Sequence, residues 1–168
     1  MHSPETDNDH IKLISGLVEQ YILEDSLNQY GKINEKLLPY EYYEIERTDD
    51  GLATQPKPGF QWKNEENFIE WIGLPEYFDA SDSEHVKNQI LNSGMVAASI
   101  DLCALDVFDF QGEDAWYVFY VPIFNVDSTV AYIQYDHYDA GYGEGNAAIF
   151  IKEQGQWKYY KFIPGWMM

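Results

Sequence analysis

The chain has 168 residues, of which 29 are Asp or Glu and 10 are Lys or Arg, giving a formal net charge of −19 at pH 7. Hydrophobic residues make up 45% and aromatic residues 17% of the chain, so it can build a core and is no disordered acidic tail. The acidity argues against nucleic acid, nucleotides and anionic membranes as partners, because like charges repel. The longest apolar run, residues 116–124, is too short to cross a bilayer, so we expect a soluble protein without a transmembrane segment.

The N-terminus predicts a polar leader over residues 1–8, loosely ordered, followed by a single domain over residues 9–168. The first residues contain no basic start and no apolar segment, so the chain as written lacks a signal peptide and indicates a cytoplasmic protein. The alternative is the mature part of an exported lipoprotein, because an acidic run such as SPETDND is also typical of the stretch after an anchor cysteine. Both compartments stay open at this point.

Before the terminal sheet, the pattern predicts one long helix and two short strands. Apolar residues from Ile11 to Ile22 recur at spacings of three and four, which places them on one face of a helix running from Asp9 to about Asn28. Residues 37–47 and 99–110 alternate apolar and polar side chains and predict the strands.

Two shorter helices are predicted in the middle of the chain. The first follows Asn64 and should end at Gly73, because glycine is typical of helix C-termini. The second follows Ser81, whose spacing to Glu84 matches a capping box in which the two residues satisfy each other's backbone donors. We expect Gly94 to end this helix.

The C-terminal third predicts four strands of alternating aromatic and β-branched residues. They cover residues 116–124, 129–138, 147–151 and 157–163. The short connections between them, such as Gln154-Gly155-Gln156, require antiparallel pairing, because a parallel pair needs a longer crossover. The expected fold class is therefore α+β, with the N-terminal helix and the shorter helices packed on one face of a C-terminal antiparallel sheet.

The strongest candidate for a metal site combines Asp136, His137, Asp139 and Glu144, since imidazole and carboxylates are metal ligands. Adjacent residues of a strand face opposite ways, however, so Asp136 and His137 should not converge. No HExxH pair or calcium-loop spacing supports the site. We therefore expect a solvated strand end, without a metal or cofactor.

Other catalytic signatures are weak. The glycines at positions 141, 143 and 145 resemble a phosphate-binding loop, but they join two predicted antiparallel strands beside acidic residues, so a plain connection is favoured. Cys103 is the single cysteine, which excludes an internal disulfide, and nearby Asp residues do not lower a thiol pKa. No serine occupies a G-x-S-x-G elbow. The sequence therefore predicts a protein that is not an enzyme.

The charge distribution suggests a binding role instead. No Lys or Arg occurs between Lys87 and Lys152, while acidic and tyrosine residues are frequent there. We expect a non-catalytic module, of the immunity or inhibitor type, that binds a basic protein by charge complementarity and aromatic anchors. The predicted partner-binding residues are Asp109, Glu113, Asp114, Asp136, Tyr138, Asp139, Tyr142 and Glu144.

Two alternatives remain. The acidity can serve solubility alone. The chain can also be an exported or surface-anchored domain that binds a small ligand in a pocket between the N-terminal helix and the sheet.

Residues 120–158 carry a loose motif of a P-I-F triplet, spaced Asp, Ala and Tyr residues, a Gly-rich turn and a closing G-x-W. The matching residues are Pro122, Ile123, Phe124, Asp127, Ala131, Tyr138, Gly141, Gly143, Gly145, Gly155 and Trp157. This pattern resembles a group of small bacterial proteins, many from Bacteroidetes. The resemblance implies a similar fold that ends in a β-hairpin, and it implies no particular activity. Members of that group often carry cysteines in the Gly-rich turn, whereas this chain has none there.

Overall fold

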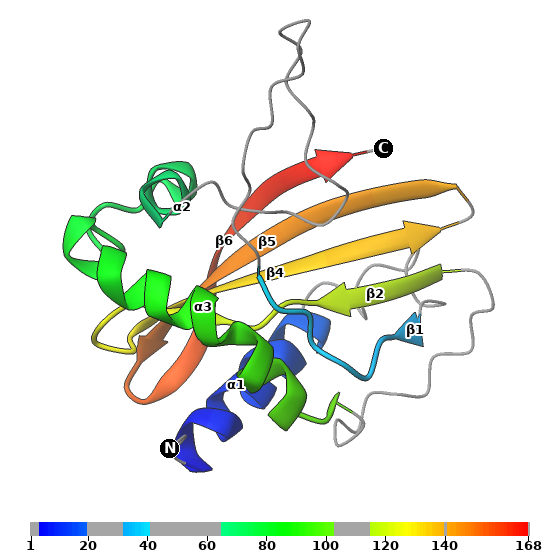
Figure 1. Ribbon diagram of the computed structural model, residues 1–168, viewed down its shortest axis with the longest axis horizontal. Helices are drawn as coiled ribbons and strands as arrows, with labels where there is room; N and C mark the ends of the chain where they lie inside the picture. The colour runs from blue at the N-terminus through cyan, green and yellow to red at the C-terminus, as the bar shows by residue number, and fades with distance from the viewer. Residues whose placement is uncertain (1–3, 20–31, 41–64, 103–114, 140, 168) are drawn as a thin grey trace, which may run out of the picture.

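The computed structural model describes residues 4–19, 32–40, 65–102, 115–139 and 141–167 (Figure 1). Its helices are α1 (Pro4–Leu17), α2 (Glu65–Ile72) and α3 (Ser83–Ser99), with a short 3-10 helix, η2 (Ala80–Asp82), before α3. Its strands are β1 (Lys32–Ile33), β2 (Ala115–Phe119), β3 (Ile123–Phe124), β4 (Val130–Asp139), β5 (Tyr142–Glu153) and β6 (Gln156–Met167).

The strands form one sheet in the order β1-β2-β4-β5-β6, with β3 pairing to β4 beyond the end of β2. The pairs from β2 to β6 are antiparallel, which confirms the predicted pairing of the C-terminal third. The single strand predicted over residues 116–124 is divided into β2 and β3. The pair β1–β2 is parallel and was not predicted. The expected glycine connection is confirmed only for Gly141, which lies in the turn between β4 and β5 with a φ of 94°. Strand β5 begins at Tyr142, so Gly143 and Gly145 belong to the strand, opposite Tyr138 and Asp136.

Helices cover both faces of this sheet. Phe68 of α2 packs edge-on against Tyr132 of β4, with ring centroids 4.8 Å apart. On the other side, the Phe150 ring lies against Gly16 of α1, and Phe150 is the register partner of Ala131. We call the side of Tyr132 the front face and the side of Ala131 the back face.

The predicted α+β class is confirmed, but the helices do not gather on one face. The physical reason is burial: the strand side chains from Val130 to His137 are all buried, and they alternate between the two faces. A strand that is buried on both faces needs cover on both, and one layer of helices cannot supply it. Helix α1 covers the back face, and α2 with α3 covers the front.

Helix α1 corrects the predicted leader. It starts at Pro4, so residues 4–8 are helical rather than loosely ordered. Proline is favourable in the first helical turn, where its missing N–H would be unpaired. The predicted extension to Asn28 lies outside the described residues, which end here at residue 19.

The predicted capping box of α3 is displaced. The capping box lies one turn earlier, at η2, and its cap is Asp79: Asp79 Oδ1 accepts from the Ser81 N–H at 2.7 Å, and Asp82 Oδ2 accepts from the Asp79 N–H at 3.0 Å. Asp82 is the N-cap residue of α3 and makes no side-chain cap hydrogen bond to it. Asp82 Oδ1 also accepts from the Val126 N–H at 2.8 Å, so the cap ties α3 to the turn before β4. Both roles favour Asp79 and Asp82 over the predicted Ser81 pair.

The predicted end of the first middle helix is confirmed, and the predicted end of the second is wrong. Helix α2 lies where the sequence placed it, and Gly73 follows it with a φ of 61°. Helix α3, by contrast, continues through Gly94 to Ser99, so Gly94 is not its end. Neighbouring contacts extend this helix, because Val96 and Ala97 are buried in the core.

The two predicted middle strands are not formed in the described residues. Leu38 makes a single bridge to Tyr120, and Asp101 makes one to Lys36. The expected strand from Ser99 is wrong at its start, because Ser99 is the last residue of α3. The remainder of both predicted strands, together with Cys103, lies outside the described residues.

Candidate functional site

The predicted binding residues that the structure describes lie at one end of the β4–β5 hairpin. The register pairs Asp139 with Tyr142, Tyr138 with Gly143, His137 with Glu144 and Asp136 with Gly145. We call residues 136–139 and 142–145 the hairpin end. Sequence reasoning therefore located five of its residues together, whereas Asp109, Glu113 and Asp114 lie outside the described residues.

The strand alternation divides these residues between the two faces. Asp139, Tyr142 and Glu144 share the back face with His137, because cross-strand partners point the same way. Asp136 and Tyr138 point to the front. The sequence treated the whole group as a single surface, and the structure shows two.

The back face is an acidic and aromatic surface. Tyr142 is 42% exposed, and its hydroxyl donates to Glu144 Oε2 at 3.0 Å. This hydrogen bond is the main cause of the raised pKa of Tyr142. Only the protonated hydroxyl can donate to the carboxylate, so the bond stabilises the neutral form of the tyrosine. Asp139, beside Tyr142, is exposed.

His137 lies next to the same carboxylate on the back face. Its Nδ1 lies 3.6 Å from Glu144 Oε1, and its ring stacks on Tyr117 with centroids 4.4 Å apart and an interplanar angle of 17°. The histidine is only 8% exposed. The Glu144 carboxylate thus lies between the Tyr142 hydroxyl, which donates to it, and the His137 ring.

On the front face, Asp136 corrects the prediction. Its side chain is fully buried, so it does not form a surface for a partner. The Tyr120 hydroxyl donates to Asp136 Oδ2 at 2.9 Å, and the Tyr138 hydroxyl lies 3.4 Å from the same atom. These donors replace water around the carboxylate, which is the condition for burying it. Burial first, then the charge of Asp136, raises the pKa of Tyr138 to about 12.

Trp116 is the site residue that sequence reasoning missed. It is 46% exposed and stacks on Tyr138, with ring centroids 5.2 Å apart and an interplanar angle of 22°. The sequence placed it in a continuous apolar run and gave it no part in binding. The available signal was its position at the start of that run.

The candidate metal cluster does not assemble within the described part of the chain. Asp136 and His137 face opposite ways, as the strand pattern predicted. Among the described residues, no group of three or more His, Cys, Asp or Glu side chains is placed to hold a metal ion. Across the same ranges, every helix is too short or too polar to pass through a bilayer.

The fold and the hairpin end define an α+β sheet protein with an acidic, tyrosine-bearing end. Comparisons of the chain with protein-family models, with curated proteins and with solved structures gave no match. Its function is therefore inferred from the residues of this chain.

Proposed function

We propose that the protein is a non-catalytic module, of the immunity or inhibitor type, that binds a basic protein through the hairpin end. The observation that carries this proposal is the joint presentation of Asp139, Tyr142 and Glu144 on one face. Carboxylates attract a basic partner, and a partly exposed tyrosine supplies the kind of anchor found in binding hot spots.

The order of this surface favours binding. Because the Tyr142 hydroxyl already donates to Glu144, a partner has less of that side chain's freedom to remove, which lowers the entropic cost of association. The same contacts speak against catalysis. His137 is buried against Tyr117, which leaves little of its ring to reach a substrate.

The charge around the hairpin end is uneven. No Lys or Arg occurs in the sequence between Lys87 and Lys152, so neither strand of the hairpin end contributes a positive charge. On the other flank, Lys32 of β1 is the register partner of Trp116. We therefore expect the attraction to a basic partner to be strongest on the back face, at Asp139 and Glu144.

The test is affinity capture from a lysate of the native organism and its neighbours, with washes of increasing salt. Three baits are compared: the wild type, a back-face variant combining Asp139→Lys with Tyr142→Ala, and the control Asp127→Lys. Asp127 is an exposed acidic residue in the turn before β4, away from the hairpin end.

The proposal predicts one basic protein that the wild type and the control retain at low salt, that high salt releases, and that the back-face variant does not retain. Equal retention by all three baits would place the binding surface elsewhere. Wild-type bait that retains no basic protein would remove the proposed function.

A further inference from the structure

A row of polar side chains lies along the front face of β4, buried from Tyr132 to Asp136 and partly buried at Tyr138. Its members are Tyr132, Gln134, Asp136 and Tyr138, at alternate positions of the strand. The Tyr132 hydroxyl donates to Gln134 Oε1 at 3.1 Å. The row is therefore connected, and Tyr120 joins it through its hydrogen bond to Asp136.

Gln134 Nε2 and Tyr40 Oη are buried in this region and make no hydrogen bond within the described residues. Their residues are 2% and 5% exposed. A buried polar atom without a partner destabilises the folded state, so two such atoms close together call for an explanation.

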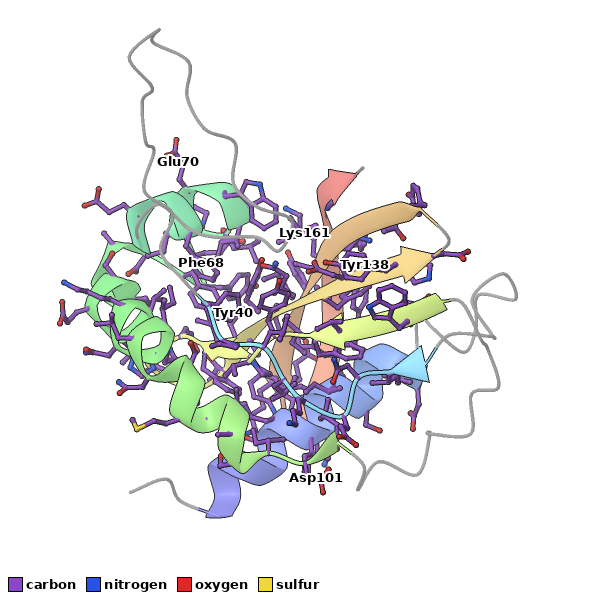
Figure 2. All side chains as sticks on the ribbon, turned by 45° about the vertical axis from the view of Figure 1, so that its right-hand side comes forward. Tyr40, Phe68, Glu70, Asp101, Tyr138 and Lys161 are labelled. Carbon is purple, nitrogen blue, oxygen red and sulfur yellow. The ribbon has the colours of Figure 1, made fainter. Side chains whose placement is uncertain are left out.

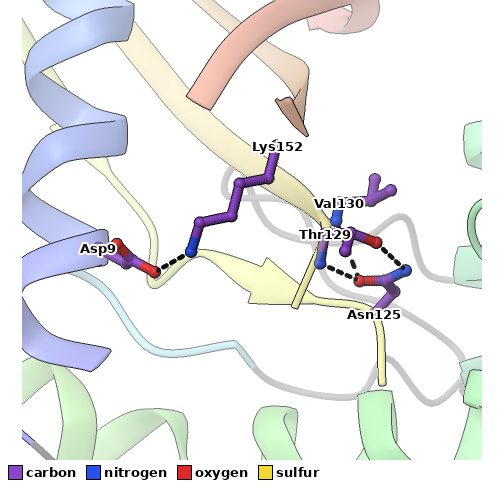
Figure 3. Close-up of polar contacts among 5 residues, drawn as sticks. All are labelled: Asp9, Asn125, Thr129, Val130 and Lys152. Atoms are coloured by element: carbon purple, nitrogen blue, oxygen red, sulfur yellow. Dashed lines mark hydrogen bonds and ion pairs between the residues drawn. The ribbon is translucent and has the colours of Figure 1, made fainter. Parts of the chain in front are cut away.

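The two atoms belong to the same neighbourhood. The Tyr40 and Tyr120 rings have centroids 5.2 Å apart, and Figure 2 shows Tyr40 in the middle of the molecule, between α3 and the strands. Burial, followed by Tyr132 and Tyr120, raises the pKa of Tyr40, while the backbone N–H of Gln134 acts in the opposite direction. The Tyr40 hydroxyl therefore lies beside Gln134, although it forms no hydrogen bond of proper geometry to it.

Small residues occupy the neighbouring strand along the same row. On β5, the register partners of Tyr138, Asp136 and Gln134 are Gly143, Gly145 and Ala147. None of these has a side chain larger than a methyl group. The polar row thus borders a strip of sheet that is mostly backbone.

The chemistry of the row limits what it can bind. Asp136 raises the pKa of the Tyr120 and Tyr132 hydroxyls, second only to burial, so its negative charge reaches this region and would repel an anion. A metal ion is disfavoured, because Gln134 Nε2 can only donate a hydrogen bond. A neutral oxygen that both accepts and donates satisfies both open atoms.

We propose that the front face of β4 holds a buried site for a neutral hydroxyl oxygen, which accepts from Gln134 Nε2 and pairs with Tyr40 Oη. The oxygen belongs either to an ordered water or to a hydroxyl of a small polyol or sugar. The site is independent of the basic partner, and it lies on the face opposite to the N-terminal helix.

Tyr40→Phe is the variant that tests the site. It keeps the ring and its packing on Tyr120 and removes only the hydroxyl. If that hydroxyl binds an oxygen, its loss lowers the melting temperature by about 2–4 °C. If it is unpartnered, its removal leaves the melting temperature unchanged or raises it, and the proposal is wrong. Tyr160→Phe, on a 47% exposed side chain, is the control and should have no effect.

A high-resolution crystal structure, with and without glycerol or glucose, identifies the source of the oxygen. Electron density for an oxygen within hydrogen-bond distance of Gln134 Nε2 supports the site, and its absence overturns it. A melting-temperature rise with glycerol or glucose that is larger in the wild type than in Tyr40→Phe indicates a ligand hydroxyl. Equal rises in both proteins, with the density present, indicate water.

Discussion

The two ends of the β4–β5 hairpin share one continuous register but differ in residue composition and in the exposure of their side chains. At the inner end, residues 130–134 pair with residues 147–151, and the β4 side chains on both faces are buried under helices. At the hairpin end, Asp139 and Tyr142 are exposed, and carboxylates and tyrosines replace most of the aliphatic residues.

The difference shows that packing of helices on the sheet, rather than strand pairing, decides whether a strand side chain is buried in the core or exposed. The backbone hydrogen bonds are of the same kind at both ends, so they cannot account for the contrast. The inner end lies between α1 and α2, which contact Phe150 and Tyr132. Where the helices no longer cover the sheet, polar and aromatic side chains can reach a partner.

The largest predicted contrast uses one tyrosine from each end. Tyr132→Ala should lower the free energy of unfolding by about 3–5 kcal/mol, because a fully buried ring packed against Phe68 and Trp71 is replaced by a cavity. Tyr142→Ala should change it by less than about 0.5 kcal/mol. Chemical denaturation of both variants measures the pair, and similar losses would show that the two ends do not differ in this way.

Gly165→Ala examines the hairpin end from the neighbouring strand. A Cβ at this position would overlap the backbone oxygen of Gly145, beside a register shift between β5 and β6. Backbone on both sides cannot give way easily, so we expect a loss of about 1–3 kcal/mol in denaturant unfolding. A loss below about 0.5 kcal/mol would mean that β6 separates from β5 at little cost there.

Alkaline pH should destabilise the protein through its buried tyrosines, most of which lie on the front face. Burial is the main cause of the raised pKa values of Tyr40, Tyr120 and Tyr132, and it raises the pKa of Tyr138 to about 12. Unfolded tyrosines titrate near pH 10, so the folded state holds these protons more tightly. Their contribution to stability is complete below about pH 10 and is lost as pH rises through the folded pKa values.

Denaturant unfolding across this alkaline range measures the effect. Tyr138→Phe should reduce the decline in stability, since it removes one of the titrating groups. Tyr160→Phe, on an exposed side chain for which no comparable burial exists, should leave the decline unchanged. A wild-type stability that stays constant through the alkaline range would contradict the buried hydroxyl row.

Gly94→Ala is the smallest predicted effect and has the opposite sign. Gly94 lies inside α3, and nothing would lie within 4 Å of an added Cβ. Alanine should therefore stabilise the protein by about 0.5–1 kcal/mol, the difference in helix propensity. A destabilising result in thermal unfolding would instead indicate that Gly94 ends the helix, as its sequence context suggested.

Local patterns predicted the parts of the fold that depend on neighbours in sequence. Alternating aromatic residues placed the C-terminal strands, and Gln154-Gly155 is a tight turn with both φ angles positive, at 51° and 77°. The arrangement of the helices around the sheet was harder to predict from the sequence. The two faces of β4 carry similar tyrosines, so no pattern could say that helices would cover both.

The candidate site was predictable as a region but not as a surface. The acidic and tyrosine-rich stretch identified the hairpin end, because the residue types of a stretch are known from the sequence whatever the topology of the strands. The burial of Asp136 depends on Tyr120, which lies on another segment and donates to it across the sheet. The exposure of Trp116 likewise depends on where the helices stop, and neither fact is local.

The central claim is that the hairpin end attracts the partner, and association kinetics test it most directly. The rate constant for binding the captured basic protein is measured at low and high salt for the wild type, Asp139→Lys and Asp127→Lys. The account predicts that Asp139→Lys slows association roughly tenfold at low salt, with a smaller effect at high salt, while Asp127→Lys stays near the wild type. Equal slowing by both variants, or rates independent of salt, would contradict it.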